Sequence, residues 1–172
     1  MFEARAARLS GAAEPLMDVG LWHMAGRLGL ACLLGGMLGI ERDLKGHEAG
    51  LRTHMLLSLG AGLFALVSVA SFDDFIDADD PNIQVDPSRI ASYVAAGVGF
   101  IGGGTIVKHR GEVTGLTTAT SLWVAAAIGV ACGLGLWQPA LIVAALALGS
   151  LAVLHPISRA LDRRSGTGDE AA

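Results

Sequence analysis

The sequence has little charge and almost no cysteine, and each shortage excludes a class of protein. Asp, Glu, Lys and Arg make up 16% of the 172 residues, whereas 52% are hydrophobic and the mean hydropathy is +0.55. Because soluble domains carry about 25% charged residues, this composition excludes a water-soluble globule. The two cysteines, Cys32 and Cys132, lie within apolar segments, which excludes a disulfide framework and a thiolate metal site.

Patterns that mark common catalytic sites are also missing. The sequence contains no G-x-S-x-G, no H-E-x-x-H and no P-loop, and its five histidines lack the spacing of metal ligands. The N-terminal residues contain no hydrophobic segment typical of a cleaved signal peptide. We therefore expect a protein that is not an enzyme, that holds no cofactor or metal, and that does not bind nucleic acid.

Long apolar runs separated by short polar segments are the main feature of the sequence. Most are close to the ~20 residues that a helix needs to cross a bilayer. They predict an all-α integral membrane protein with about five transmembrane helices, at residues 22–40, 53–72, 90–107, 116–134 and 140–154. We divide the chain into a polar N-terminal segment (1–20), a transmembrane domain (21–155) and a basic, partly disordered cytoplasmic tail (156–172).

Positive charge is distributed unevenly among the predicted loops. With five spans, one side of the membrane would hold Arg42, Lys45, Arg52, Lys108, Arg110, Arg159, Arg163 and Arg164. Lys and Arg mark cytoplasmic loops, so the N-terminus is expected outside and the C-terminus in the cytoplasm. The loop 73–88, which holds six aspartates, then faces outward. Its spacing matches no EF-hand, so we favour a solvated loop over a divalent-cation site.

One phrase of the sequence occurs twice. Lys45-Gly46 is matched 65 residues later by Arg110-Gly111, and Gly50-Leu51 is matched by Gly115-Leu116. Both copies join one predicted helix to the next. The chain is therefore predicted to contain two related helical hairpins plus a fifth helix.

The first copy of the phrase contains the first candidate site, a charged corner of the predicted bundle. The corner consists of Glu41, Arg42, Asp43, Arg52 and Thr53. It follows a GxxxG pattern, at which helices approach closely and partly enclose their neighbours. The alternative is a solvated turn held by ion pairs four residues apart, such as Glu41 with Lys45. The sequence leaves both interpretations open.

Two further sets of residues are predicted to face other helices. Hydroxyl groups recur with helical spacing at Thr114, Thr117, Thr118 and Ser121. On one helix face they would form a polar lining at the cytoplasmic mouth of the bundle, or act as interhelical hydrogen bonds. Small residues that permit close helix packing occur at Gly35, Gly39, Gly99, Gly103 and Gly104.

Four phrases, spread over residues 27–137, together form a specific pattern. They are Leu38-Gly39-Ile40-Glu41-Arg42, Gly50-Leu51-Arg52-Thr53-His54-Met55-Leu56, Gly97-Val98-Gly99-Phe100-Ile101-Gly102-Gly103-Gly104 and Gly115-Leu116-Thr117-Thr118-Ala119-Thr120-Ser121-Leu122-Trp123. In these phrases the chain resembles the membrane domain of the MgtC/SapB family of bacterial inner-membrane proteins. Longer members of that family carry a cytoplasmic ACT-like domain after the last helix. The chain resembles a short member without it.

The resemblance implies a multi-pass protein of the bacterial inner (plasma) membrane. Some members of the family are associated with magnesium limitation and with virulence, and one restrains the F-type ATP synthase. Our leading expectation is a non-enzymatic protein that binds another membrane complex such as the ATP synthase, with the charged corner as its cytoplasmic contact. The repeat and the glycine-rich third helix favour the alternative, an oligomeric transporter or channel for an ion or small solute. The expected partners are thus the lipid bilayer, a membrane protein and further copies of the chain.

Overall fold

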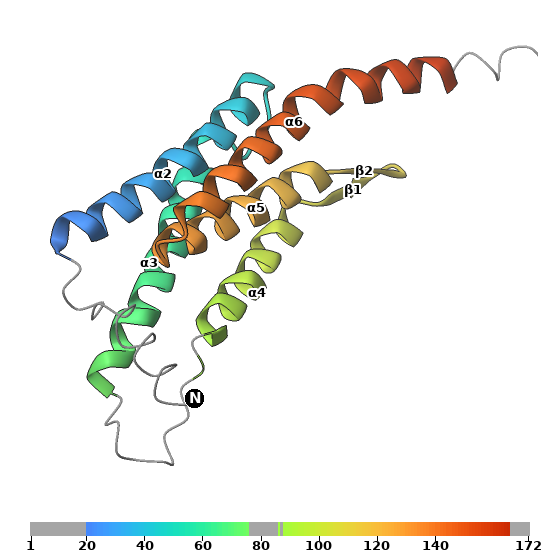
Figure 1. Cartoon of the computed structure of the whole chain (residues 1–172). Helices are drawn as coiled ribbons and strands as arrows, with labels where there is room; N and C mark the ends of the chain where they lie inside the picture. The colour runs from blue at the N-terminus through green and yellow to red at the C-terminus, as the bar shows by residue number, and fades with distance from the viewer. Residues whose placement is uncertain (1–19, 76–85, 87, 166–172) are drawn as a thin grey trace, which may run out of the picture.

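The computed structural model describes residues 20–75, 86 and 88–165 (Figure 1). This part of the chain contains α2 (Leu21–Leu44), α3 (Leu51–Phe75), α4 (Ser88–Gly104), β1 (Val107–His109), β2 (Glu112–Thr114), α5 (Leu116–Gly133) and α6 (Trp137–Ser165). The predicted N-terminal segment except Gly20, residues 76–85 of the predicted acidic loop and the tail beyond Ser165 lie outside the described residues.

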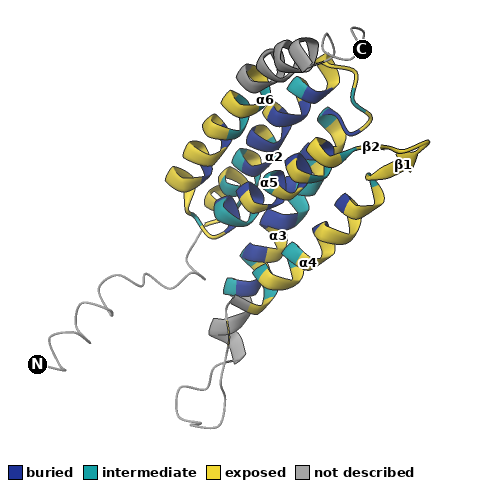
Figure 2. Ribbon diagram, turned by 90° about the vertical axis from the view of Figure 1, so that its right-hand side faces the viewer, coloured by how far each residue is buried: buried dark blue, intermediate teal, exposed yellow. Residues whose placement is uncertain are grey.

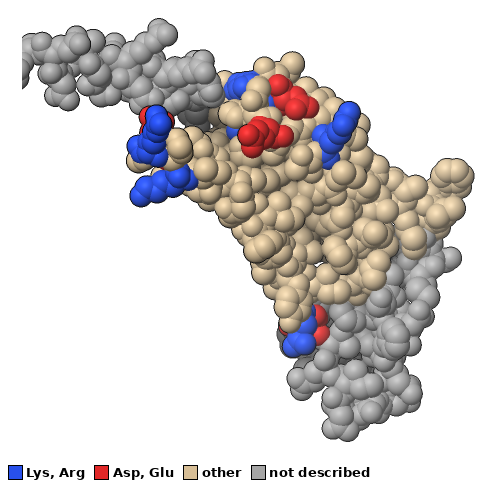
Figure 3. All heavy atoms as spheres, turned by 180° about the vertical axis from the view of Figure 1, so that it is seen from behind, with Lys and Arg blue, Asp and Glu red and all other residues tan. Residues whose placement is uncertain are grey.

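The helices confirm an all-α membrane protein. Three segments are long and apolar enough to cross a membrane, at Leu21–Leu44, Leu51–Val69 and Leu116–Gly133. A shorter apolar helix covers Trp137–Ala152, and α4 is only 17 residues long. On the face shown in Figure 3, the described charged residues lie at the two ends of the molecule, with a wide uncharged band between them. This distribution fits a protein embedded in a bilayer, whereas its sidedness stays a prediction.

The helices form two successive hairpins, α2–α3 and α4–α5, with α6 packed on α2 and α5. The most extensive contacts join α3 to α5 and α2 to α3, so these three helices form the centre of the bundle. In Figure 2 the buried residues lie on the sides of α2, α3 and α5 that face one another, whereas α4 is largely exposed. The fold therefore has a compact three-helix centre, with α4 at its edge.

Glycine determines how closely the central helices approach. A Cβ on Gly39 would lie 2.6 Å from the Leu51 Cα, and a Cβ on Gly35 would lie 2.5 Å from the Ser58 Cβ. Both predicted packing glycines of α2 thus lie against α3. In contrast, a Cβ on Gly99, Gly103 or Gly104 would have no neighbour within 4 Å among the described residues. The predicted packing glycines of α4 therefore have open space on their Cβ side in the part of the chain that the structure describes.

The two related turns share glycine conformations but differ in structure. Gly46 and Gly111 both adopt positive φ angles, of 72° and 93°, which a residue without a Cβ adopts readily. The second turn forms a β-hairpin in which Val107 pairs with Thr114. We predicted instead a helix continuing to residue 107 and a short turn. The helix ends at Gly104 because successive glycines weaken it, and the β-branched residues that follow favour strands.

The last helix also differs from its prediction. The expected helix ended at residue 154, ahead of a basic tail, whereas α6 continues to Ser165. It therefore crosses the boundary that we drew at residue 155. Its first half packs on the bundle, where Ala140 and Ala144 join the core formed by α2 and α5.

Candidate functional site

Several polar side chains are buried inside a bundle that is otherwise apolar. We call five of them the polar core, namely Arg42, His54, Ser58, Thr118 and Ser121. A polar group in a membrane-embedded interior is unfavourable unless it is hydrogen-bonded, and such groups commonly mark functional sites. Each of the five comes from α2, α3 or α5, at or near the end of the bundle that holds the two related turns, which we call the charged end.

Arg42 is the most unusual member, because a full positive charge is only 2% exposed. It lies in the last turn of α2. Its Nη2 donates a hydrogen bond of 3.3 Å to Thr118 Oγ1 on α5, and its Nη1 is 4.0 Å from Glu41 Oε2. Its Nε has no hydrogen-bond partner among the described residues. Arg42 therefore connects α2 to α5, and its Nε–H group remains available to donate a further hydrogen bond.

His54 connects α3 to α5 in the same layer. Its ring is fully buried, with Nδ1 2.9 Å from the Gly50 carbonyl oxygen and Nε2 3.1 Å from Ser121 Oγ. Because a carbonyl only accepts, Nδ1 carries a proton. The Ser121 hydroxyl donates to the Thr118 carbonyl at 2.9 Å. When the ring is neutral, Nε2 carries no proton and can only accept a hydrogen bond. The single hydroxyl proton of Ser121 then has two possible acceptors, His54 Nε2 and the Thr118 carbonyl oxygen.

The polar core continues along α3 toward the middle of the bundle. Ser58 donates a hydrogen bond of 2.8 Å to the Ala31 carbonyl of α2. A Cβ on Gly129 of α5 would collide with the Ser58 carbonyl oxygen. The helices around Ser58 are thus in direct backbone contact, so the interior is closed at this level.

The remaining acidic residues of the predicted corner close the first turn. Asp43 Oδ2 accepts a hydrogen bond of 2.8 Å from the Leu51 amide at the start of α3, which satisfies a free N–H of that helix end. Glu41 forms an ion pair with Lys45, whose Nζ also donates to the Leu151 carbonyl of α6 at 2.6 Å. Both carboxylates are therefore engaged within the chain.

The structure thus divides the charged corner into two parts. Glu41 and Arg42 are largely enclosed and Asp43 caps α3, whereas Arg52 and Thr53 are exposed at the first turn of α3. The idea that all five residues face a partner is therefore wrong for Arg42. Its aliphatic stem and guanidinium are covered because Gly35 and Gly39 bring α2 against α3.

The predicted hydroxyl face is also only partly correct. Thr118 and Ser121 are buried, but Thr117 is exposed and Thr114 belongs to β2. The reason is Gly115, which adopts a left-handed backbone conformation with a φ of 87° and separates β2 from the start of α5. Thr114 therefore cannot continue the helical spacing.

A cavity of about 570 Å³ lies between the two related turns, and we call it the polar cavity. Its polar lining consists of Thr53, Thr105, Thr114, Thr118, Glu48 and His47. Thr118 belongs both to the polar core and to the lining of the cavity. Its hydroxyl group, which accepts a hydrogen bond from Arg42, therefore connects Arg42 to the cavity. The described residues contain no group of three or more His, Cys, Asp or Glu side chains that could hold a metal ion directly.

Sequence reasoning missed His54 and Ser58 as members of the polar core. It predicted the ion pair of Glu41 with Lys45, which the structure confirms, but not the contact of Lys45 with α6. His54 and Ser58 are four residues apart on α3, which places both on one face of the helix. Two polar residues with this spacing inside an apolar run could have indicated a buried polar face of the helix. Lys45 reaches α6 through a contact between residues 106 apart, which no local pattern predicts.

Comparison with known proteins assigns the chain to a family. A family model described as "MgtC family" matches residues 28–160. The chain belongs to the MgtC family. Its matched region contains the polar core and the residues that line the polar cavity.

Two relatives of this MgtC-family protein illustrate the match. "Putative magnesium transporter YhiD" of Escherichia coli (strain K12) is 42% identical over 132 residues, covering 77% of this chain and 60% of the relative. "Protein MgtC" of Brucella abortus (strain 2308) is 37% identical over 142 residues, covering 83% of this chain and 56% of the relative. The chain thus spans about 60% or less of the length of these relatives. No solved structure matches it.

Proposed function

We propose that this protein acts in the bacterial inner membrane by binding rather than by catalysis, and that the polar cavity takes up a hydrated magnesium ion for transport. The observation that carries the proposal is the convergence of threonine hydroxyls and Glu48 from both related turns on one cavity at the charged end. The name of the YhiD relative, a putative magnesium transporter, agrees with this choice of ion.

The chemistry of the cavity supports a hydrated ion. Magnesium prefers oxygen ligands and usually keeps several waters, and one or two carboxylates are enough to hold it. Six waters occupy roughly 180 Å³, at about 30 Å³ each, which is well below the volume of the cavity. Glu48 supplies one carboxylate, and the hydroxyls of Thr53 and Thr118 supply hydrogen bonds to coordinated water. Glu41 lies near Arg42 as well as Lys45, so its carboxylate offsets only part of the positive charge beside the cavity.

A transport cycle would have to open the bundle below the cavity. The contact between Gly129 and the Ser58 backbone closes the interior at that level. An ion entering from the charged end would therefore stop at the polar core. Release on the other side requires α5 to move relative to α3, as expected for alternating access between two related hairpins.

Magnesium flux into proteoliposomes tests this function. The test variant is Thr118→Val, and its matched control is Thr117→Val, whose side chain is exposed and does not line the cavity. We expect flux in wild type and in Thr117→Val, and a loss of roughly tenfold in Thr118→Val and in Glu48→Gln. Absence of flux in the wild type, or equal flux in all variants, would contradict magnesium transport.

A second candidate function is regulation of another membrane complex, such as the F-type ATP synthase, during magnesium limitation or intracellular stress. It is favoured by the outer face of α4, where an added Cβ on Gly99 or Gly103 would have no described residue within 4 Å. Small residues allow another helix to approach closely. The exposed β-hairpin, with Lys108 and Arg110, would replace the charged corner as the contact beside the membrane.

A pull-down from gently solubilised membranes, followed by mass spectrometry, tests this alternative. The variant is Gly103→Leu, and the control is Gly26→Leu on α2, where a side chain would also meet open space. Recovery of ATP synthase subunits with wild type and Gly26→Leu, but not with Gly103→Leu, is the expected result. Recovery of the chain alone in every case would contradict the regulatory function.

A further inference from the structure

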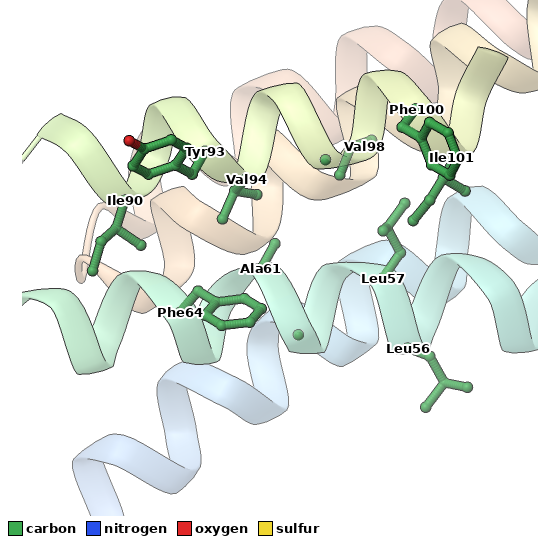
Figure 4. A pocket seen from close by; sticks show the side chains of 12 residues that line it. Leu56, Leu57, Ala61, Phe64, Ile90, Tyr93, Val94, Val98, Phe100 and Ile101 are labelled. Atoms are coloured by element: carbon green, nitrogen blue, oxygen red, sulfur yellow. The ribbon is translucent and has the colours of Figure 1, made fainter.

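A second cavity of about 460 Å³ lies between α3 and α4, and we call it the apolar groove. Its floor consists of Leu57 and Ala61 from α3 and of Val94 and Val98 from α4. In Figure 4, Leu57 and Ala61 point from α3 toward α4, whereas the rings of Phe64 and Tyr93 lie over their own helices. The groove is separate from the polar cavity, with which it shares no lining residue.

Two glycines keep the groove open. Gly60 on α3 and Gly97 on α4 both line it, and a Cβ on either would meet nothing within 4 Å. The hollow therefore exists because side chains are missing at these two positions. A larger residue there would fill the groove without displacing the helix backbones.

The groove lies where a protein surface meets lipid. Its α3 wall belongs to the candidate membrane span Leu51–Val69. Along α4 it extends from Ile90 to Ile101, which is roughly 17 Å at 1.5 Å per residue. This length is about half of the ~30 Å hydrocarbon core, so the groove covers the depth of one leaflet.

One end of the groove combines a cation with an aromatic hydroxyl. Arg89 is exposed in the first turn of α4. It precedes Tyr93 by four residues, so the two share a helix face with the groove-lining residues Ile90 and Gly97. Tyrosine and arginine at the end of a membrane helix lie at the height of lipid headgroups. This end can therefore hold a phosphate group.

We propose that the apolar groove binds one acyl chain of a phospholipid whose phosphate is held by Arg89. An acyl chain carries no side groups and fits a narrow channel lined only by hydrocarbon. A helix from a second copy is about 10 Å wide, and it would have to displace the exposed rings of Tyr93 and Phe100, which line the groove, to reach its floor. The proposal does not depend on magnesium transport, since the two cavities are separate.

Native mass spectrometry of the delipidated protein tests the site, with dioleoylphosphatidylglycerol and dioleoylglycerol as probes. The first probe carries a phosphate and the second does not. The groove-filling variants are Gly60→Leu and Gly97→Leu. The matched control is Gly29→Leu on α2, where a side chain also meets open space but lies outside the groove. A fourth variant, Arg89→Gln, removes the cation alone.

We expect the wild type and Gly29→Leu to bind the phosphatidylglycerol at least about tenfold more tightly than the two groove-filling variants. Dioleoylglycerol should bind the wild type more weakly by about tenfold, and this preference should disappear in Arg89→Gln. Equal binding by wild type and Gly97→Leu would overturn the groove site. A preference retained in Arg89→Gln would overturn the phosphate contact, and a dimer lost in Gly97→Leu would identify the occupant as a second copy instead.

Discussion

The two turns that the repeat relates differ in how firmly the rest of the chain holds them. In the first turn, Asp43 accepts a hydrogen bond from the Leu51 amide. This turn is also connected to α5 by the hydrogen bond of Arg42 and to α6 by that of Lys45. The second extends as a β-hairpin whose residues are exposed. The same phrase thus preserves the glycine turn and the start of the next helix, but not the packing around them.

This difference separates the α2–α3 hairpin, both of whose helices lie at the centre, from the α4–α5 hairpin, of which only α5 does. Gly39 and Gly104 occupy equivalent positions in the repeat, yet a Cβ on Gly39 would meet the Leu51 backbone, whereas one on Gly104 would have no described residue within 4 Å. The α2–α3 hairpin therefore builds the bundle together with α5. Helix α4 remains at the edge, where it forms one wall of the apolar groove and is largely exposed (Figure 2).

The largest effect on stability is expected when a large side chain replaces a glycine of the α2–α3 hairpin. Gly39→Leu forces α2 away from α3 and should destabilise the protein by about 3 kcal/mol or more. Gly104→Leu at the equivalent position should change stability little. Thermal unfolding in detergent, followed by size-exclusion chromatography, measures both. Similar losses in the two variants would show that α4 is packed as tightly as α2.

A smaller effect is expected at the link between the hairpins. Arg42→Met leaves the Thr118 hydroxyl without its donor and should cost about 2 kcal/mol. In a double-mutant cycle with Thr118→Val, we expect a coupling of about 1 kcal/mol. Thr53→Val, at the position equivalent to Thr118 in the repeat, serves as the control because Thr53 is exposed. Additive losses from Arg42 and Thr118 would refute a direct contact.

The cap of the first turn should contribute less again. Asp43→Ala removes the acceptor of the Leu51 amide and is expected to cost about 1 kcal/mol. Asp43→Asn keeps a side-chain oxygen and should recover most of that loss. Chemical denaturation in mixed micelles compares the three proteins. If asparagine performs no better than alanine, the hydrogen bond does not stabilise the turn.

The smallest effect is expected at the exposed cations of the two turns. Arg52→Ala and Lys108→Ala should each change the unfolding free energy by less than about 0.5 kcal/mol, because neither side chain is buried. Any loss of function in these variants would then reflect a lost contact with a ligand or partner. A large loss of stability in either would mean that the residue supports the fold.

The fold could be predicted because its signals are local. Apolar runs of sufficient length indicate helices, and the repeated Lys45-Gly46 and Arg110-Gly111 pairs locate both turns, in which Gly46 and Gly111 adopt the positive φ that glycine favours. The β-hairpin was missed because its strands are only three residues long and follow directly from an apolar helix.

The site could be predicted only in part, because burial depends on distant residues. Arg42 was placed in the charged corner that was expected to contact a partner, but it donates to Thr118 of α5 and is buried inside the bundle. His54 was grouped with the scattered histidines, and its partner Ser121 lies 67 residues away. The threonines of both turns were recognised as polar, yet only the three-dimensional approach of the turns creates the cavity between them.

The most direct test of the polar cavity is the accessibility of Thr53→Cys in a protein whose own Cys32 and Cys132 are replaced. A membrane-impermeant maleimide is applied from the side of the charged end, with magnesium chloride or with sodium chloride at equal ionic strength. We predict rapid labelling that magnesium slows and sodium does not, because the ion occupies the cavity that Thr53 lines. Equal labelling rates in both salts would contradict magnesium binding at this site.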